Sequence, residues 1–175
     1  MILGKKSILR ALEPGDVPSY HQWINDVETN YWRGLSHPMS EAQARSWIEL
    51  ESQADAEKLT LAIDTQNGEF VGIIGLRGIC PRSRRAEIWI YLGNKDRWRQ
   101  GIGTDAIATL CRYAFEQLNL HRLWLECEPE NFGAVRCYEK NNFLKEGIFR
   151  DGYYRHGGYR DTVVMALLKT DWVKI

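Results

Sequence analysis

The sequence predicts an α/β (α+β) protein with a central mixed, mostly antiparallel sheet of about seven strands flanked by four helices. Three observations favour this class. Two segments with helical apolar spacing come early in the chain, strand-like segments follow in direct succession, and helices then alternate with strands. The expected order is β-α-α-β-β-β-α-β-α-β-β.

The N-terminal part predicts one strand and two helices. Residues 5–12 alternate weakly between apolar and polar side chains and end at a Pro-Gly turn, which indicates a strand. Asp16 is placed to cap a helix that runs to about residue 25. Ser40 and Gln43 have the spacing of a capping box, which predicts the start of a second helix.

The middle of the chain predicts an antiparallel meander. Residues 59–64 and 69–79 flank Asn67-Gly68, the strongest short signal for a hairpin. Residues 85–92 are rich in β-branched and aromatic side chains and supply the third strand.

Helices and strands alternate in the remainder of the chain. Apolar spacing and cap residues predict a helix over 104–118, a strand over 122–127, a helix that follows the Asn131 cap, and a final hairpin of 143–149 with 159–168 around Asp151-Gly152 and Gly157-Gly158.

Composition favours one domain over residues 1–175 and excludes several classes of partner. The 23 basic residues balance 23 acidic ones, which argues against nucleic acid or an anionic membrane as a partner. No apolar run could span a membrane and no signal-peptide core is present, so the cytoplasm is the expected location. The four cysteines and four histidines lack metal-ligand spacing; we expect reduced thiols and no metal.

A glycine turn precedes the helix expected at 104–118. Gly101 and Gly103 flank Ile102, and a strand-like segment comes before them. Glycines allow backbone amides to approach a ligand, and a helix N-terminus attracts anions. Ala106 excludes the dinucleotide fingerprint, and no Gly-Lys-Ser or Gly-Lys-Thr follows, which excludes a P-loop. The turn therefore predicts a site for a phosphate or pyrophosphate.

Two motifs together resemble the GNAT superfamily of acyl-CoA-dependent N-acetyltransferases. They are the Gly101-Ile102-Gly103 turn and a series of residues from Asn131 through Ala134 and Tyr138 to Phe143. The similarity extends over residues 8–172 and is strongest to the branch of ribosomal-protein-alanine and spermidine acetyltransferases. Trp98 departs from the usual Gln or Arg. Asn142 replaces a glycine, a mild change because asparagine accepts the left-handed conformation.

The resemblance implies acetyl-CoA as cosubstrate. It implies that main-chain amides of the glycine turn bind the pyrophosphate, that the strand before it pairs with the pantetheine arm, and that Asn131 binds a pantetheine amide as well as capping its helix. The cofactor-binding residues expected from it are Ile90, Tyr91, Leu92, Arg99, Gln100, Gly101, Ile102, Gly103, Thr104, Asn131 and Tyr138.

Two side chains are candidates for proton transfer. Tyr138 is the candidate general acid, because a phenol suits a thiol leaving group; the alternative is core packing. Glu87 is the candidate base, because a carboxylate within an apolar strand needs a partner or a purpose. Its alternative is an ion pair with an arginine such as Arg85. Glu126 and Glu128 are reserve candidates for the base.

The acceptor is expected to be a small-molecule or peptide amine. Tyr31, Trp32 and Glu28 lie where the family builds its acceptor wall, whereas Trp23 and Trp47 have the spacing of helix-packing residues. A protein N-terminal α-amine and a polyamine both remain open. The alternatives are an antibiotic or amino-acid amine, or a coenzyme A-binding sensor without turnover. A homodimer through the last strands is possible.

For two further features we favour an explanation that gives them no role in the site. Cys137 has no histidine and orienting carboxylate placed beside it, so an acyl-enzyme on this thiol is not expected. Arg82, Arg84 and Arg85 could meet a remote phosphate of the coenzyme, but such a run is more often a solvated hairpin tip.

Overall fold

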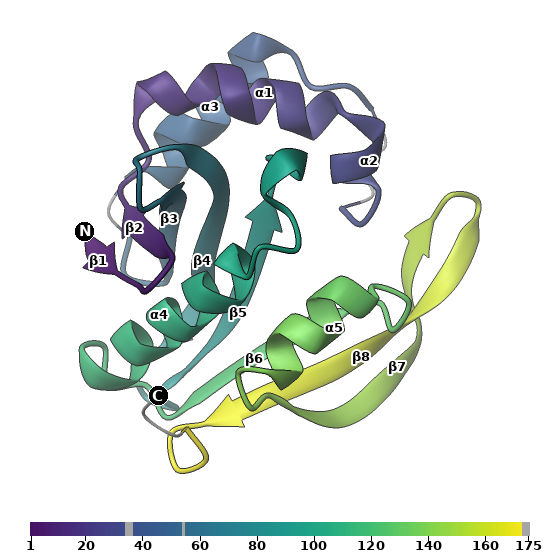
Figure 1. Ribbon diagram of the computed structural model, residues 1–175. Coiled ribbons are helices and arrows are strands. Elements are labelled where there is room, and N and C mark those ends of the chain that lie inside the picture. The colour runs from purple at the N-terminus through teal and green to yellow at the C-terminus, as the bar shows by residue number, and fades with distance from the viewer. Residues whose placement is uncertain (34–36, 54, 173–175) are drawn as a thin grey trace.

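A twisted mixed sheet with helices on both faces forms the protein (Figure 1). The computed structural model describes residues 1–33, 37–53 and 55–172. Within them, eight strands follow the order β1-β2-β3-β4-β5-β6-β8-β7, and every neighbouring pair is antiparallel except β5 with β6. The helices α1 and α3 pack on one face and α4 and α5 on the other.

The elements of the sheet are β1 (Ile2–Leu3), β2 (Ser7–Arg10), β3 (Lys58–Thr65), β4 (Phe70–Cys80), β5 (Arg85–Leu92), β6 (Arg122–Cys127), β7 (Leu144–Arg155) and β8 (Gly158–Leu168). The helices are α1 (Val17–Asn25), α2 (Val27–Asn30), α3 (Glu41–Glu51), α4 (Ile102–Glu116) and α5 (Phe132–Glu139), with short 3-10 turns η1 (Pro14–Asp16) and η2 (Lys95–Arg97).

The structure confirms most of the predicted elements, and the local signals that predicted them have the expected geometry. The Ser40 hydroxyl accepts from the Gln43 amide at 3.2 Å, and the Gln43 side chain accepts from the Ser40 amide at 2.8 Å, so the capping box starts α3 as expected. Gly68 has a φ of 80° in the predicted β3–β4 hairpin. Asn142 has a φ of 62°, the left-handed conformation anticipated for it.

Four details differ from the prediction. The strand β1 and the helix α2 were not anticipated, because segments of 2 and 4 residues are too short to show periodicity. The helix α4 starts at Ile102 rather than Thr104. Asp151-Gly152 lies within β7, at a register shift, rather than in the turn.

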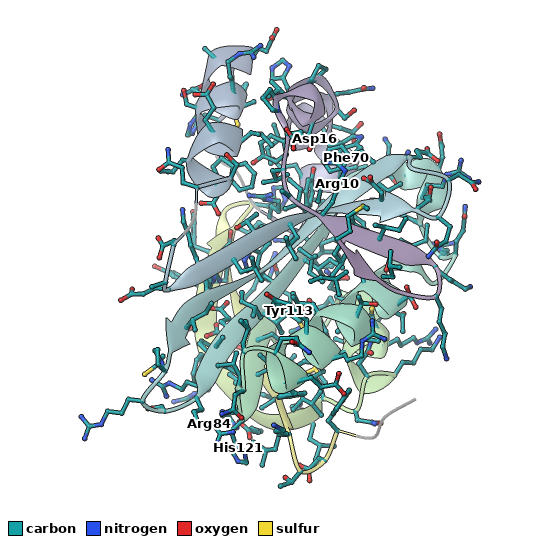
Figure 2. The ribbon with its side chains drawn as sticks, turned by 90° about the vertical axis from the view of Figure 1, so that its left-hand side faces the viewer. Arg10, Asp16, Phe70, Arg84, Tyr113 and His121 are labelled. Carbon is teal, nitrogen blue, oxygen red and sulfur yellow. The ribbon has the colours of Figure 1, made fainter. Side chains whose placement is uncertain are left out.

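Asp16 precedes α1 as predicted, but its side chain makes no cap bond to that helix. Instead it accepts two hydrogen bonds from Arg10, whose Nε donates to Asp64 at 2.6 Å. The Arg10 guanidinium also lies 5.4 Å from the centre of the Phe70 ring. Figure 2 shows Arg10, Asp16 and Phe70 together, so this ionic cluster joins β2 to the start of α1.

The core consists of two apolar layers, one on each face of the sheet. The larger layer lies between the sheet and α4, and includes Ile74, Ile88 and Phe115. The second lies under α1 and α3; Trp23 is 9% exposed in it and Tyr20 stacks on Trp47 at 4.6 Å. Trp23 and Trp47 thus pack helices, as their spacing predicted.

Candidate active site

A gap opens in the sheet where β5 and β6 separate. Only Arg85, Ala86 and Glu87 of β5 pair with β6, opposite Arg122, Leu123 and Trp124. Beyond these pairs β5 continues to Leu92 along β4, and β6 pairs with β8 (Figure 1). Ile90, Tyr91 and Leu92 therefore have a strand neighbour on one side, in the part of the chain that is described. Their other edge has no strand partner, and apart from the Leu92 carbonyl, which accepts from Trp98 Nε1, it can bond an extended ligand.

The glycine turn lies after β5 and opens α4. Gly101 has a φ of 81°, which a residue with a Cβ rarely adopts, and it is the N-cap of the 15-residue helix. The amides of Ile102, Gly103 and Thr104 point out of the first turn, where an α-helix offers them no intrahelical acceptor. A Cβ at Gly103 would lie 2.9 Å from the Leu92 side chain, so glycine lets α4 pack closely on β5.

The β1–β2 turn brings a cation to this site. Asp105, in the first turn of α4, accepts hydrogen bonds from the amides of Lys5, Lys6 and Ser7 at 2.9 to 3.0 Å. With the turn held in this way, Lys6 Nζ donates to the Gln100 carbonyl at 2.9 Å. The ammonium of Lys6, from the β1–β2 turn, therefore lies beside the start of α4.

Helix α5 packs against the same end of α4. Asn131 caps α5 by accepting from the Ala134 amide at 3.2 Å, as expected. Asn141 Nδ2 donates to the Thr104 carbonyl at 3.1 Å, and the Thr104 hydroxyl lies 3.3 Å from Cys137 Sγ. The two helices thus fix the position of Tyr138, which is 6% exposed and part of the main core.

The two candidates for proton transfer come from different elements, Tyr138 from α5 and Glu87 from β5. Burial raises the pKa of Tyr138, and the nearby thiols of Cys127 and Cys137 and the carboxylate of Glu87 raise it further. The phenol therefore stays protonated at neutral pH. Glu87 belongs to the last residue pair that joins β5 to β6, at the start of the gap.

Glu87 is also in an ion pair with an arginine, as the alternative interpretation anticipated. The partner is Arg77, its cross-strand neighbour on β4, and not Arg85. The side chain of Glu87 remains 17% exposed. Ion pairing and a role in proton transfer are compatible, so the base assignment stays a prediction.

The reserve candidates for the base differ in availability. Glu128 is buried and occupied by Arg155, whose Nε and Nη2 donate to its two oxygens at 2.9 and 2.5 Å. Glu126 is exposed and accepts from the Thr162 hydroxyl at 3.3 Å. Glu128 is therefore the weaker of the two reserves.

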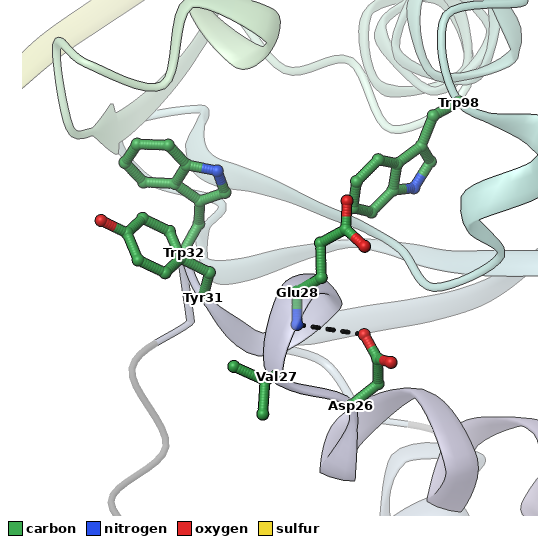
Figure 3. Close-up of a pocket in the computed structure, with 6 residues that line it drawn as sticks. All are labelled: Asp26, Val27, Glu28, Tyr31, Trp32 and Trp98. Atoms are coloured by element: carbon green, nitrogen blue, oxygen red, sulfur yellow. Dashed lines mark hydrogen bonds between the residues drawn. The ribbon is translucent and has the colours of Figure 1, made fainter.

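A pocket of about 440 Å³ lies on the other side of the glycine turn and contains the three expected acceptor residues. Tyr31, Trp32 and Glu28 line it together with Asp26, Val27 and Trp98 (Figure 3). Trp98 connects the pocket with the gap, because its Nε1 donates to the Leu92 carbonyl at 2.9 Å.

The acidic rim of this pocket binds an ammonium group of the protein itself. Lys95 Nζ lies 2.9 Å from Asp26 Oδ2 and 3.2 Å from Glu28 Oε2. Backbone bonds from Thr29, followed by the Lys95 ammonium, lower the pKa of Asp26. The rim thus holds a primary ammonium, that of Lys95, between two carboxylates.

The sequence model of the GNAT acetyltransferase domain matches residues 6–144. The chain belongs to the GNAT family. It is 36% identical over 170 residues to Bacillus subtilis YdaF, which carries the provisional name of a ribosomal N-acetyltransferase, covering 94% of this chain and 92% of the relative. It is 29% identical over 172 residues to the spermidine N(1)-acetyltransferase of Vibrio cholerae, with 94% of each chain covered.

The GNAT fold is confirmed by solved structures as well. Spermidine N-acetyltransferase from Vibrio cholerae, in complex with CoA and spermine, superposes with a TM-score of 0.85 at 25% identity, covering 95% of this chain and 97% of that one. The expected enzyme class and cosubstrate follow: the chain is an N-acetyltransferase with acetyl-CoA as donor. The left-handed Gly101, the free first turn of α4 and the unpaired edge of β5 fit such a donor.

Other expectations concern metal, membrane and cysteines. Among residues 1–33, 37–53 and 55–172, no group of His, Cys, Asp and Glu side chains is arranged to hold a metal ion. None of the helices in these ranges is long and apolar enough to cross a membrane. All four cysteines are free; Cys111 is buried, and the others are half-buried. Burial raises the pKa of Cys137, which disfavours its thiolate.

The arginine-rich turn lies far from the glycine turn. Arg82, Arg84 and Arg85 are exposed at the β4–β5 connection. Arg84 Nε donates to the Asn119 carbonyl at 2.7 Å, just beyond the C-terminal end of α4, where Figure 2 shows Arg84 beside His121. A 15-residue helix spans about 22 Å. The turn is thus solvated, as favoured from the sequence.

Sequence reasoning missed Lys6, Asp105 and Arg155. Each makes contacts with residues that lie 94 to 124 positions away along the chain, and Arg155 also bonds to Glu128, 27 positions away. No local pattern encodes such contacts, and only the topology of the sheet brings them together.

Proposed function

We propose that this GNAT enzyme transfers an acetyl group from acetyl-CoA to a primary amine by direct attack in a ternary complex. The observation that carries the proposal is the unpaired edge of β5 beside the left-handed Gly101 that opens α4, with Glu87 and Tyr138 as the candidates for proton transfer. Direct transfer needs one group to take a proton and another to supply one.

On the donor side, acetyl-CoA supplies the acetyl group as a reactive thioester. The first amides of α4, at Ile102, Gly103 and Thr104, are proposed to bind its pyrophosphate, with Arg99 and Lys6 adding positive charge. The free edge of Ile90, Tyr91 and Leu92 and the amide nitrogen of Asn131 are proposed to hold the pantetheine arm.

Glu87 is proposed to accept the proton of the attacking amine, directly or through water, and Tyr138 Oη to protonate the departing thiolate. Because its pKa is raised, Tyr138 carries the required proton throughout the neutral range. Presenting a neutral α-amine at pH 7 costs about 1.4 kcal/mol, whereas an alkylamine costs about 4.6 kcal/mol. The engagement of Glu87 with Arg77 favours the less demanding α-amine.

The acceptor is proposed to enter through the pocket that Tyr31, Trp32 and Glu28 line. The Lys95 ammonium lies between Asp26 and Glu28, and an acceptor ammonium that binds there is proposed to displace it. A protein N-terminus and a polyamine both present such a group, in accord with the names of the two relatives. The cytoplasm stays the expected location, in accord with four free cysteines.

A homodimer is proposed through β7, which lies at the edge of the sheet. Apolar side chains of the strand are exposed, among them Leu144, Ile148 and Phe149 at 48 to 63%. An unpaired edge with exposed apolar groups favours association. A monomeric mass in sedimentation equilibrium would exclude it.

The test of the function is thiol release from acetyl-CoA with a panel of amines: spermidine, ribosomal N-terminal peptides that begin with alanine or serine, free amino acids and aminoglycosides. We expect one acceptor class to be turned over well. No turnover with any of them, while acetyl-CoA binds tightly in calorimetry, would favour the sensor alternative.

Tyr138→Phe is expected to lower kcat by about 10²- to 10⁴-fold. The Kd of acetyl-CoA should stay within about twofold, because the ring is retained. Tyr154→Phe, at an exposed tyrosine of β7, is the matched control and should retain full activity. Equal activity of both variants would remove Tyr138 from the mechanism.

A further inference from the structure

One buried cation lies at the end of a strand that is otherwise exposed. Arg155 is the last residue of β7 and is 5% exposed, whereas its neighbours Tyr154 and His156 are exposed. A guanidinium is costly to bury unless its charge and donors are all used. The contacts of Arg155 therefore show which groups compensate for the burial of its charge.

Arg155 bonds to two segments distant in sequence. It makes two hydrogen bonds to the buried carboxylate of Glu128, which follows β6. Its Nη1 donates to the Tyr31 carbonyl at 2.9 Å, 124 residues away. Its guanidinium carbon also lies 4.2 Å from the ring centre of Tyr31 and 4.8 Å from that of Trp32. Both distances are those of cation–π contacts.

The neighbours of Arg155 on the hairpin add contacts to the same segment. His156 stacks on Tyr31 at 5.1 Å, and Tyr153 Oη donates to the Arg33 carbonyl at 2.7 Å. Tyr31 and Trp32 meet edge to face at 4.9 Å. The two aromatic side chains that line the acceptor pocket are thus held by the tip of the β7–β8 hairpin.

We propose that Arg155 is a positioning residue for the acceptor site. Its planar fork holds the backbone of Tyr31, stacks on Tyr31 and Trp32, and ties both to Glu128 on the segment that leads to Asn131. The proposal rests on the proposed function, in which this pocket takes the acceptor. The aromatic pair is accordingly a wall shaped by the protein's own cation, and the acceptor ammonium is proposed to bind at Asp26 and Glu28 in place of Lys95.

The decisive variant is Arg155→Ala, with Arg160→Ala as matched control. Arg160 lies on the same hairpin, is exposed, and donates to the carbonyl of its neighbour Tyr159. With an N-terminal alanine peptide and with spermidine, we expect Arg155→Ala to raise the acceptor KM at least tenfold. The Kd of acetyl-CoA should stay within twofold, and Arg160→Ala should change neither. An unchanged acceptor KM in Arg155→Ala would overturn the proposal.

Chemical rescue distinguishes the planar geometry of the guanidinium from the effect of its positive charge alone. Ethylguanidinium should restore the KM of Arg155→Ala, whereas ethylammonium should not, and Arg155→Lys should resemble Arg155→Ala. Rescue by both cations alike would overturn the positioning role. If Arg155→Ala does not fold, the double variant Arg155→Ala with Glu128→Gln removes the unpaired buried charge and should show the same rise in KM.

A binding measurement keeps this inference distinct from the proposed function. Ethylguanidinium should bind Arg155→Ala saturably and restore the near-UV circular dichroism of the Tyr31–Trp32 pair, without any turnover. Lack of turnover by the unaltered enzyme with every amine would overturn the proposed function. Lack of ethylguanidinium binding to a folded Arg155→Ala would overturn the inference alone.

Discussion

The strands β4 and β7 have almost the same length, 11 and 12 residues, but opposite surroundings. β4 lies between β3 and β5, and its side chains from Val71 to Leu76 are buried. β7 is the edge of the sheet, and Arg155 at its end is its buried side chain. Apolar packing thus fixes the first half of the sheet, whereas directional polar contacts fix the tip of the last hairpin.

This difference corresponds to the two halves of the proposed site. The donor side is built on β5 and α4, which share the main apolar layer. The acceptor wall depends on hydrogen bonds and stacking at the hairpin tip. In the proposed enzyme, the donor side is thus built on apolar packing, whereas the acceptor wall depends on polar contacts that include the buried Arg155–Glu128 pair.

The largest effect is expected from the same truncation in both strands. Ile74→Ala, at a fully buried position of β4, should lower the free energy of unfolding by about 2–5 kcal/mol. Ile148→Ala, where β7 is 48% exposed, should change it by less than about 1 kcal/mol. Denaturant titrations measure both. Equal losses would show that β7 is buried in solution, as a dimer through this edge requires.

A smaller effect is expected from a pair of aspartates. Asp105 accepts from three amides and the Ser7 hydroxyl, whereas Asp161 on β8 is exposed and accepts from the Asp151 amide. Asp105→Ala should cost about 1–3 kcal/mol of unfolding free energy, because these donors lose a charged acceptor. Asp161→Ala should cost less than about 1 kcal/mol. The reverse order would contradict the role of Asp105 in joining β1 and β2 to α4.

The smallest effects are expected from removing the charge of two carboxylates, those of Asp26 and Glu146. The pKa of Asp26 is lowered by backbone bonds from Thr29 and by Lys95, and that of Glu146 by its bond to Arg122. A lowered pKa contributes stability above the ordinary value near 4, and that contribution is lost as pH falls through the lowered value.

Asp26→Asn and Glu146→Gln should therefore each cost less than about 1 kcal/mol at pH 7. The difference from the unaltered protein should shrink as pH falls through the lowered pKa values. Unfolding titrations at pH 7, 5 and 3 measure this dependence. A difference that grows toward low pH would contradict the sign of both shifts.

Elements with local signals could be predicted from the sequence. The capping box of Ser40 and Gln43, the Asn67-Gly68 turn and the tolerance of Asn142 for a left-handed conformation each depend on a few adjacent residues. The glycine turn was placed correctly for the same reason, since a left-handed Gly101 before an apolar helix is a local property.

The contacts that shape the site could not be predicted in this way. Asp16 was expected to cap α1, but the pairing of Arg10 across β2 and β3 places a stronger partner beside it. The alternative for Glu87 was an ion pair with an arginine such as Arg85, but antiparallel register puts Arg77 opposite it. The position of Arg155 depends on the whole path of the β7–β8 hairpin. In each case tertiary register determines the partner.

The short pairing between β5 and β6 has a consequence for the stability of the protein. Three residue pairs carry the sheet bonding between its two halves. In the proposed complex, acetyl-CoA lies in the gap and offers a backbone partner to the unpaired edge of β5. At a hundredfold excess over its Kd, any ligand of the native state stabilises it by about 2.7 kcal/mol. Acetyl-CoA is therefore expected to make the purified enzyme more resistant to unfolding and to proteolysis.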